Sequence, residues 1–378
     1  MLGPRWRLAA GAAGISVALI LSGCGAVSPT PRPTPSHPSP SPSATGSASG
    51  FEAASVTFVS ATQGWALGTA PCAKGRCLAV VQTDDAGASW SRLKPPPTGY
   101  SEEGGVDGIR FADSLDGWAF GSSQLWATHD AGASWTRVEI PGWPSADFFG
   151  LETADGVVYL TFVGSVAQDR VRVASSPVGS NDFTVSPTSV ERGAGPVPYT
   201  ELVVQGAGAW LLQVDRTVIG GAQLAGTRWT EWAPPCVQAN GAAVLAASSA
   251  RDLFAVCDQG VWGPASPVGD RAWVSSDGGS SFSLLPTALP SLTSAGPSLG
   301  PIASPSPTVI AIGDGTSILA SFDGGGSWST VFSGSKPITY LGFTTPSQGV
   351  AISSPYQGAP GSLLMTHDGG HSWAAIAF

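Results

Sequence analysis

One eight-residue pattern recurs five times along this chain of 378 residues. It reads Ser/Thr, any residue, Asp, any residue, Gly, any residue, Ser/Thr and an aromatic residue, and we call it the box. The copies are TDDAGASW at 83–90, THDAGASW at 128–135, SSDGGSSF at 275–282, SFDGGGSW at 321–328 and THDGGHSW at 366–373. A pattern with this many fixed positions does not recur five times by chance, so the chain is built from repeated units.

The spacing of the boxes predicts how many units there are. Their aspartates are Asp85, Asp130, Asp277, Asp323 and Asp368. Consecutive aspartates lie 45, 147, 46 and 45 residues apart, and the long interval equals three steps of 49. Two degenerate units therefore belong inside it, and remnants of their boxes stand at 175–183 (SSPVGSNDF) and 225–229 (AGTRW). The chain then holds seven units of about 46 residues.

A second pattern marks a turn inside the units. FVSATQGW at 58–65, FADSLDGW at 111–118 and FTTPSQGV at 343–350 share Phe, four residues, Gln or Asp, Gly and an apolar residue. In the second unit, the short runs at 108–113, 117–121, 125–130 and 134–140 are typical of β-strands. Units of four strands at this period predict an all-β fold, a single seven-bladed β-propeller of four-stranded antiparallel blades over residues 51–378.

These two patterns together resemble a known family. The boxes are similar to the Asp-box, or BNR, repeat. Their pairing with the Gly-Trp turn resembles the propellers of photosystem II stability/assembly factors and of sortilin-type receptors, and more distantly those of sialidases. The resemblance covers nearly all of residues 51–378 and implies the propeller fold. It implies little about function, because one fold carries many functions.

We expect the five box aspartates to be structural. An Asp carboxylate accepts hydrogen bonds from the N–H groups of its own turn, and a glycine such as Gly132 permits a positive φ. Five equivalent carboxylates on five blades cannot converge on one substrate. We also expect the closing aromatic residues, and Trp65 and Trp118 of the second pattern, to pack in the core.

The first 50 residues indicate export and anchoring. Arg5 and Arg7 precede an apolar run at 8–21 that is too short to span a bilayer, and LSGC follows at 21–24. This order resembles a bacterial lipoprotein signal, which implies cleavage after residue 23 and a lipid on Cys24; a secretory peptide with an incidental cysteine is the alternative. Residues 24–50 are rich in Pro and Ser and are expected to form an extended tether. The implied location is the outer face of the cell membrane.

Charge and cysteine content limit the chemistry. The formal net charge is −9, it becomes −11 without residues 1–23, and only three lysines are present, so no nucleic-acid partner is expected. The four remaining cysteines belong to an oxidising compartment, and sequence proximity favours Cys72–Cys77 and Cys236–Cys257 among three possible pairings. No Cys-x-x-Cys motif or histidine partner indicates a metal site, and no cofactor is implied.

Candidate binding residues lie in the irregular connections. The turns between second and third strands, and the links between units, emerge on one face of a propeller, and loops on a rigid scaffold often carry binding residues. Units one, two and seven are neighbours in a closed ring. Their connections predict an aromatic and acidic ligand-binding patch made of Tyr100, Glu102, Glu103, Trp143 and Tyr356.

Two functions stay open. The favoured one is a monomeric, non-catalytic binding or assembly module that contacts an envelope protein or a glycan. The alternative is a sialidase-like glycoside hydrolase, which needs an arginine triad, a tyrosine nucleophile with a glutamate partner and an acid/base carboxyl. The segment before the first box offers only Arg76, and none of the five tyrosines stands in a recognisable glutamate-paired context. We therefore assign no catalytic residue.

Overall fold

The described part of the chain consists of strands and turns. The computed structural model describes residues 46–101, 104–164, 170–193, 199–215, 217–237, 242–257, 270–290, 292 and 299–378. Cys24, Glu102 and Glu103 lie outside the described residues. In those ranges, no helix has the length and hydropathy that crossing a membrane requires.

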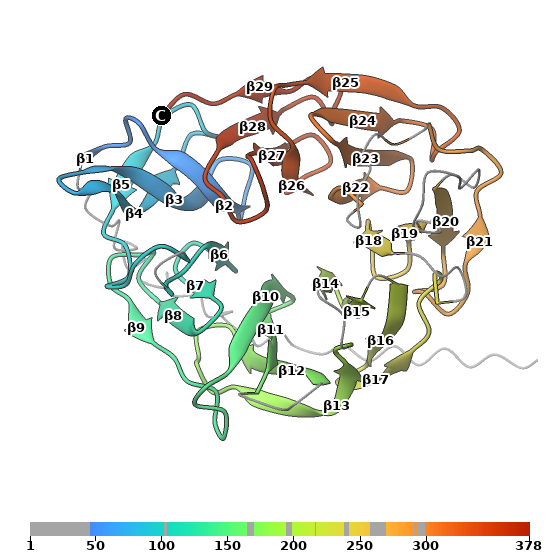
Figure 1. Cartoon of the computed structure of the whole chain (residues 1–378), viewed down its shortest axis with the longest axis horizontal. Coiled ribbons are helices and arrows are strands. Elements are labelled where there is room, and N and C mark those ends of the chain that lie inside the picture. The colour runs from blue at the N-terminus through green and yellow to red at the C-terminus, as the bar shows by residue number, and fades with distance from the viewer. Residues whose placement is uncertain are drawn as a thin grey trace, which may run out of the picture. The chain divides into compact units, whose positions relative to one another are not determined.

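Seven antiparallel sheets follow one another along the chain and stand around a ring (Figure 1). The first three blades are β2 (Glu52–Phe58), β3 (Gly64–Cys72), β4 (Gly75–Thr83) and β5 (Ser91–Leu93); β6 (Gly108–Phe111), β7 (Gly117–Gly121), β8 (Gln124–Thr128) and β9 (Thr136–Arg137); and β10 (Asp147–Ala154), β11 (Val157–Val163), β12 (Arg170–Pro177) and β13 (Thr184–Glu191). Blades 4 and 5 are β14 (Tyr199–Gln205), β15 (Gly208–Asp215), β16 (Thr217–Ala225) and β17 (Arg228–Trp232); and β18 (Ala243–Ala247), β19 (Leu253–Cys257), β20 (Arg271–Ser275) and β21 (Ser283–Leu284). Blades 6 and 7 are β22 (Ile302–Ser306), β23 (Val309–Asp314), β24 (Ser317–Ser321) and β25 (Ser329–Ser333); and β26 (Ile338–Phe343), β27 (Gly349–Ser353), β28 (Ser362–Thr366) and β29 (Ala374–Ala375).

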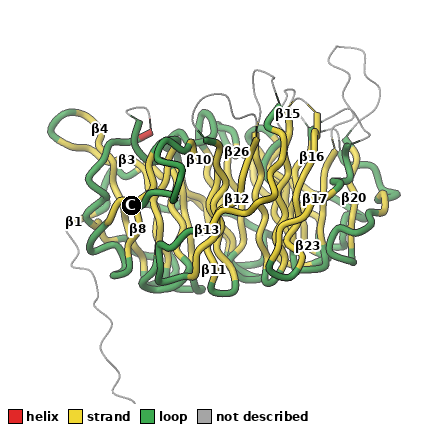
Figure 2. Tube along the Cα trace, turned by 90° about the horizontal axis from the view of Figure 1, so that it is seen from below, coloured by secondary structure: helices red, strands yellow, loops and turns green. Residues whose placement is uncertain are grey.

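The four strands of each blade, called a to d, lie in chain order from the centre of the ring outwards. The a–b and c–d turns therefore emerge on one face, the box face, and the b–c turns and d–a links emerge on the other, the loop face (Figure 2). This arrangement confirms the predicted seven-bladed propeller. A further strand, β1 (Gly46–Ser47), pairs with β5, so the first sheet begins upstream of Phe51.

The hydrophobic core lies between the blades. The described residues form seven buried clusters, one at each junction between neighbouring blades. Every cluster includes one aromatic residue that closes a box or its remnant. This residue comes from the second blade of each pair in ring order, which is blade 1 at the junction of blades 7 and 1. These residues are Trp90, Trp135, Phe183, Trp229, Phe282, Trp328 and Trp373. The sheets bury their faces only against one another, as expected for stacked repeats.

Tryptophans that follow the a–b turns join one blade to the next. Trp65, which is 0 % exposed, donates from Nε1 to the carbonyl of Ala131 in the box of blade 2, at 3.3 Å. Trp210 donates in the same way to Gly278 in the box of blade 5, at 3.0 Å. Trp118 is equally buried, but its Nε1 has no hydrogen-bond partner among the described residues. The blade that follows it, blade 3, carries a degenerate box.

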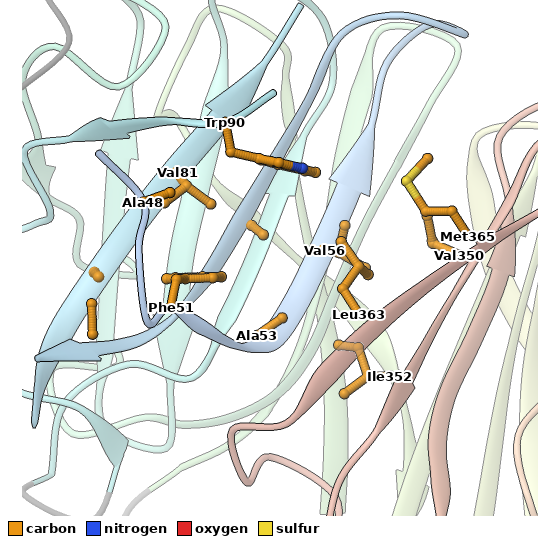
Figure 3. Packing of buried hydrophobic residues seen from close by; sticks show 13 residues of the cluster. Ala48, Phe51, Ala53, Val56, Val81, Trp90, Val350, Ile352, Leu363 and Met365 are labelled. Carbon is orange, nitrogen blue, oxygen red and sulfur yellow. The ribbon is translucent and has the colours of Figure 1, made fainter. Parts of the chain in front are cut away.

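Among the described residues, the first and last blades share no strand. Blade 7 is complete in itself and β1 extends blade 1, so the ring closes through packing at the junction of these blades, which we call the seam. At the seam β2 lies against β27 and β28, and Ala53 and Gly361 exchange two backbone hydrogen bonds of 2.9 and 2.8 Å. Figure 3 shows the apolar side chains that meet there, including Val56 of blade 1 and Met365 of blade 7.

Both predicted disulfides are present. Cys72–Cys77 joins β3 to β4 at the loop-face end of blade 1, and Cys236–Cys257 joins the link between blades 4 and 5 to the end of β19. Their Cα atoms are 5.9 and 5.6 Å apart, as disulfide geometry requires. Each bridge is local and holds a loop-face segment to a neighbouring strand.

Candidate functional site

The five boxes share one hydrogen-bond geometry, and the box of blade 2 illustrates it. The carboxylate of Asp130 accepts bonds from the hydroxyls of Thr128 and Ser134, at 2.8 and 2.6 Å, and from the Ser134 amide, at 2.8 Å. The Gly132 amide donates to the Thr128 hydroxyl at 2.9 Å, and Gly132 has a φ of 91°, which favours glycine. The same side-chain and amide bonds recur at Asp85, Asp277, Asp323 and Asp368.

Each box also ties together the two turns of its blade. The amide of Ala131, directly after the box aspartate, donates to the carbonyl of Leu115 in the a–b turn at 2.9 Å, and the other four boxes make the equivalent bond. Hydrogen bonds from Ser281 and Ser275 lower the pKa of Asp277 to about 2. The box carboxylates are therefore ionised acceptors inside their own turns at neutral pH. The expectation of a structural role stays a prediction that a substitution tests.

We expect Asp130→Ala to lower the free energy of unfolding by about 1–3 kcal/mol, because the Ser134 amide and hydroxyl lose their acceptor. Urea denaturation measures the change. Asp182→Ala is the matched control, since this exposed residue lies in the degenerate c–d turn of blade 3 and its loss should cost less than about 0.5 kcal/mol. Unchanged stability with loss of partner binding would instead make the box a recognition site.

One predicted ligand-binding residue, Tyr100, bonds the loop that carries another, Tyr356, on the loop face at the seam. Tyr100, in the link from blade 1 to blade 2, donates a hydrogen bond to the carbonyl of Gly358, in the b–c loop of blade 7. Tyr356 of that loop is 59 % exposed, more than any other exposed large hydrophobic residue of the described ranges. Asp107 lies against Gly358, and burial raises the pKa of its carboxyl. We call residues 99–101, 104–107 and 354–361 the seam sector.

Trp143 lies apart from the seam sector. Its ring packs edge-on against Phe162, with centroids 5.4 Å apart, and the guanidinium of Arg172 lies 4.7 Å from its centroid. It packs against the core between blades 2 and 3. Of the predicted patch, the described residues thus bring together Tyr100 and the loop that carries Tyr356, whereas Trp143 contributes to another junction.

An ion pair that the sequence does not predict joins four blades at the centre of the ring. Arg110 on β6 bonds Glu152 on β10 through Nε, at 3.1 and 3.2 Å, and through Nη2, at 3.0 Å. Its Nη1 donates to the carbonyl of Val56 in blade 1 at 3.2 Å, and its guanidinium lies 5.3 Å from the ring centroid of Tyr340 in blade 7. Burial opposes the charge of Arg110, but Glu152 more than offsets this and raises its pKa.

The central cluster combines a neutralised ion pair with a buried tyrosine. The side chains of Arg110 and Glu152 are only 14 and 33 % exposed, and their charges neutralise each other. Burial raises the pKa of Tyr340 and Glu152 raises it further, against the opposite influence of Arg110. One sequence feature distinguishes Arg110: it directly precedes the Phe of the turn pattern, at the position where blade 1 has Thr57.

A second inner-strand carboxyl, Glu201 on β14, faces blade 5. Its Oε2 accepts a hydrogen bond from the Leu245 amide at 3.0 Å. Between blades 1 and 2, the neutral hydroxyl of Ser55 accepts the corresponding hydrogen bond from the amide of Ile109, also at 3.0 Å. Burial raises the pKa of Glu201 to about 8, because this single backbone hydrogen bond offsets only part of the cost of the charge.

The histidines of the box face do not assemble a metal centre. Among the residues that the structure describes, no group of three or more His, Cys, Asp or Glu side chains gathers. His129 bonds Asp116 through Nδ1 and lies 3.1 Å from the amide nitrogen of Asn181 through Nε2. His371 stacks on Phe322, with ring centroids 3.7 Å apart. These side chains serve contacts between neighbouring blades.

The two faces of the propeller differ in chemistry. The a–b and c–d turns of the box face hold 11 of the 26 acidic residues and one of the 17 basic residues, Arg251. Five large hydrophobic residues of the described ranges are exposed, and none of them lies in a box-face turn. They are Phe149, Ile219, Val237, Leu284 and Tyr356. These exposed apolar side chains therefore lie outside the box-face turns, and the most exposed of them, Tyr356, lies in the seam sector.

Comparisons with known proteins identify relatives of the fold alone. No protein-family model matches the chain, and no curated protein matches its sequence. Solved structures do match. YCF48 bound to a D1 peptide is 14 % identical, with a TM-score of 0.57, and the match covers 86 % of this chain and 96 % of that one. YCF48 from Cyanidioschyzon merolae is 12 % identical over 85 % of this chain and 96 % of that one, with a TM-score of 0.57.

A third solved structure shares the same fold. The propeller domain of the Trilobed protease from Pyrococcus furiosus, which has an open velcro topology, is 7 % identical with a TM-score of 0.54. The match covers 87 % of this chain and 97 % of that one. At such low identities these likenesses show that the chain shares the fold of a seven-bladed propeller resembling YCF48.

Proposed function

We propose that this protein is a lipid-anchored propeller of the bacterial cell envelope that acts as a non-catalytic binding or assembly module. The observation that carries the proposal is the placement of Tyr356, the most exposed of the large hydrophobic residues described, in the seam sector of the loop face. Exposed apolar groups on the loops of a rigid scaffold are typical of contacts with other proteins. The structure of YCF48 with a D1 peptide supports a protein partner, because that propeller takes a peptide.

Tyr356→Ala is the cleanest test of this proposal. Tyr100 bonds Gly358 and Trp143 packs on Phe162, so their loss would disturb the fold as well as the surface. Tyr356 is mostly exposed, and its truncation should change the free energy of unfolding by less than about 0.5 kcal/mol.

We expect Tyr356→Ala to weaken partner capture from solubilised membranes by at least about tenfold, as for a hot-spot aromatic residue. Leu284→Ala is the control, because Leu284 is also exposed, at 39 %, but lies on an outer strand. Equal capture by both variants would contradict a role for the seam sector.

The proposed anchor has its own test. Cys24→Ser should move the protein from the membrane fraction to the soluble fraction, because the lipid of a bacterial lipoprotein is attached to this thiol. Mass spectrometry of the wild-type N-terminus should then find a lipidated Cys24. A variant that stays in the membrane fraction would refute the lipoprotein interpretation and leave the binding proposal to be judged by its own test.

A sialidase-like glycoside hydrolase is the alternative, and the centre of the ring does not favour it. Tyr340 does lie near Arg110 and Glu152, but this arginine is bonded to the glutamate and the pKa of the tyrosine is raised. Hydrolysis of a fluorogenic sialoside that Tyr340→Phe abolishes would establish the alternative and overturn the non-catalytic proposal.

A further inference from the structure

The segment that follows β29 packs across the seam. After β29, the backbone amide of Ile376 bonds the carbonyl of Leu363 at 2.9 Å. The ring of Phe378 then lies between two aromatic residues of blade 1, with centroids 4.8 Å from Phe51 and 5.3 Å from Trp90. Phe378 is thus partly buried against the cluster between blades 7 and 1. We call residues 374–378 the C-terminal latch.

Two further contacts cross the same seam, and both involve the loop of blade 7 that carries Tyr356. Gly361, at the end of this loop, exchanges its two backbone hydrogen bonds with Ala53. Gly358, within it, accepts the hydroxyl hydrogen bond of Tyr100. The position of the Tyr356 loop therefore depends on whether blades 1 and 7 stay together.

We infer that the C-terminal latch holds the ring closed and thereby holds the seam sector in its binding conformation. In the part of the chain that the structure describes, no strand is shared across this junction and no disulfide crosses it. It is thus the one junction of the ring that can open without cutting or stretching the backbone between consecutive blades. A partner that contacts both sides of the seam sector binds only the closed ring, so its apparent affinity falls with the fraction of closed molecules. The link between ring closure and partner affinity rests on the proposed function, whereas the closure of the ring by the latch does not.

Hydrogen exchange tests the latch without any partner. The amides of Ala53 and Gly361 report opening directly, because each is bonded across the seam. We expect Phe378→Ala to raise their exchange rates by about 10- to 100-fold, since it removes an aromatic ring from the junction. The amide of Ala359, which bonds Tyr356 within the loop, should exchange faster as well.

The matched control is Phe332→Ala. Phe332 is also a partly buried aromatic residue on an outer strand, but it packs in the core between blades 6 and 7. It should leave exchange at Ala53 and Gly361 unchanged. Tyr100→Phe removes one seam hydrogen bond and should raise exchange at the same two amides by less than Phe378→Ala does.

The outcomes separate cleanly. Faster exchange confined to the seam supports the latch, even if no partner for the seam sector is ever captured. Unchanged exchange at Ala53 and Gly361 in Phe378→Ala overturns it, and so does an equal rise in all seven blades, which would mean general destabilisation. If Phe378→Ala does not fold, Phe378→Leu keeps part of the apolar contact, and its exchange pattern decides the question by the same criteria.

Discussion

Replacing Arg110 by methionine should lower the free energy of unfolding by about 2–4 kcal/mol. The substitution keeps most of the volume but leaves Glu152 without its partner among the inner strands. It also removes the contact with Tyr340 and the hydrogen bond to Val56, so blades 7, 1 and 3 lose their common neighbour. This expected loss is smaller than that for breaking a fully buried ion pair, because the Glu152 side chain is 33 % exposed. Urea denaturation gives the value directly.

The double variant Arg110→Met, Glu152→Gln separates charge from packing. Removing the second charge should restore much of the lost stability, since an unpaired carboxylate is the main cost of the single change. Equal loss in the single and double variants would show that the guanidinium acts through packing alone. No loss in either would contradict the idea that this pair holds the centre of the ring.

Glu201→Gln should stabilise the protein at alkaline pH, by roughly 2–4 kcal/mol at pH 9, allowing for the water that reaches a partly exposed carboxyl. Burial raises the pKa of Glu201 from 4.5 to about 8, so the folded state binds this proton more tightly than the unfolded state. The wild-type protein therefore loses stability as the pH rises from about 4.5 to 8. Glutamine carries no charge at any pH and avoids this loss.

Denaturation at pH 4.5, 7 and 9 checks the sign. The difference between Glu201→Gln and wild type should be small at the lowest pH and largest at the highest. Glu231→Gln on the outer strand β17 is the control, because Glu231 is exposed and should give no such trend. A constant difference at all three values would rule out titration of Glu201 as the cause.

The repeated sequence features predict the repeated structure well. The interval of 147 residues between Asp130 and Asp277 predicts two blades without complete boxes, and blades 3 and 4 occupy that interval. Local cysteine spacing predicts both disulfides, because a bridge between cysteines close in sequence needs no knowledge of the ring. The blade count and the disulfides can be predicted because they depend on the repeat spacing and on residues that are close in the sequence.

Contacts between particular side chains that are not part of the repeated patterns cannot be predicted in this way. Arg110 meets Glu152 and Tyr340 only because the inner strands of blades 2, 3 and 7 converge at one centre. The neighbouring positions of units one, two and seven predict that Tyr100 lies near the loop of Tyr356, but not its hydrogen bond to Gly358. The sequence places Trp143 in an irregular loop, but the side chain packs against the core between blades 2 and 3 through partners that no local pattern predicts.

The most direct test of the proposed recognition is photo-crosslinking from two faces of the same protein. A benzoylphenylalanine is placed at Tyr356, in the seam sector, or at His367, an exposed residue of a box-face turn. Both proteins are expressed with their own signal and illuminated on intact cells. We predict a discrete crosslinked protein partner from position 356 and none from position 367. Crosslinking of one partner from position 367 alone would contradict recognition through the loop face and assign binding to the boxes.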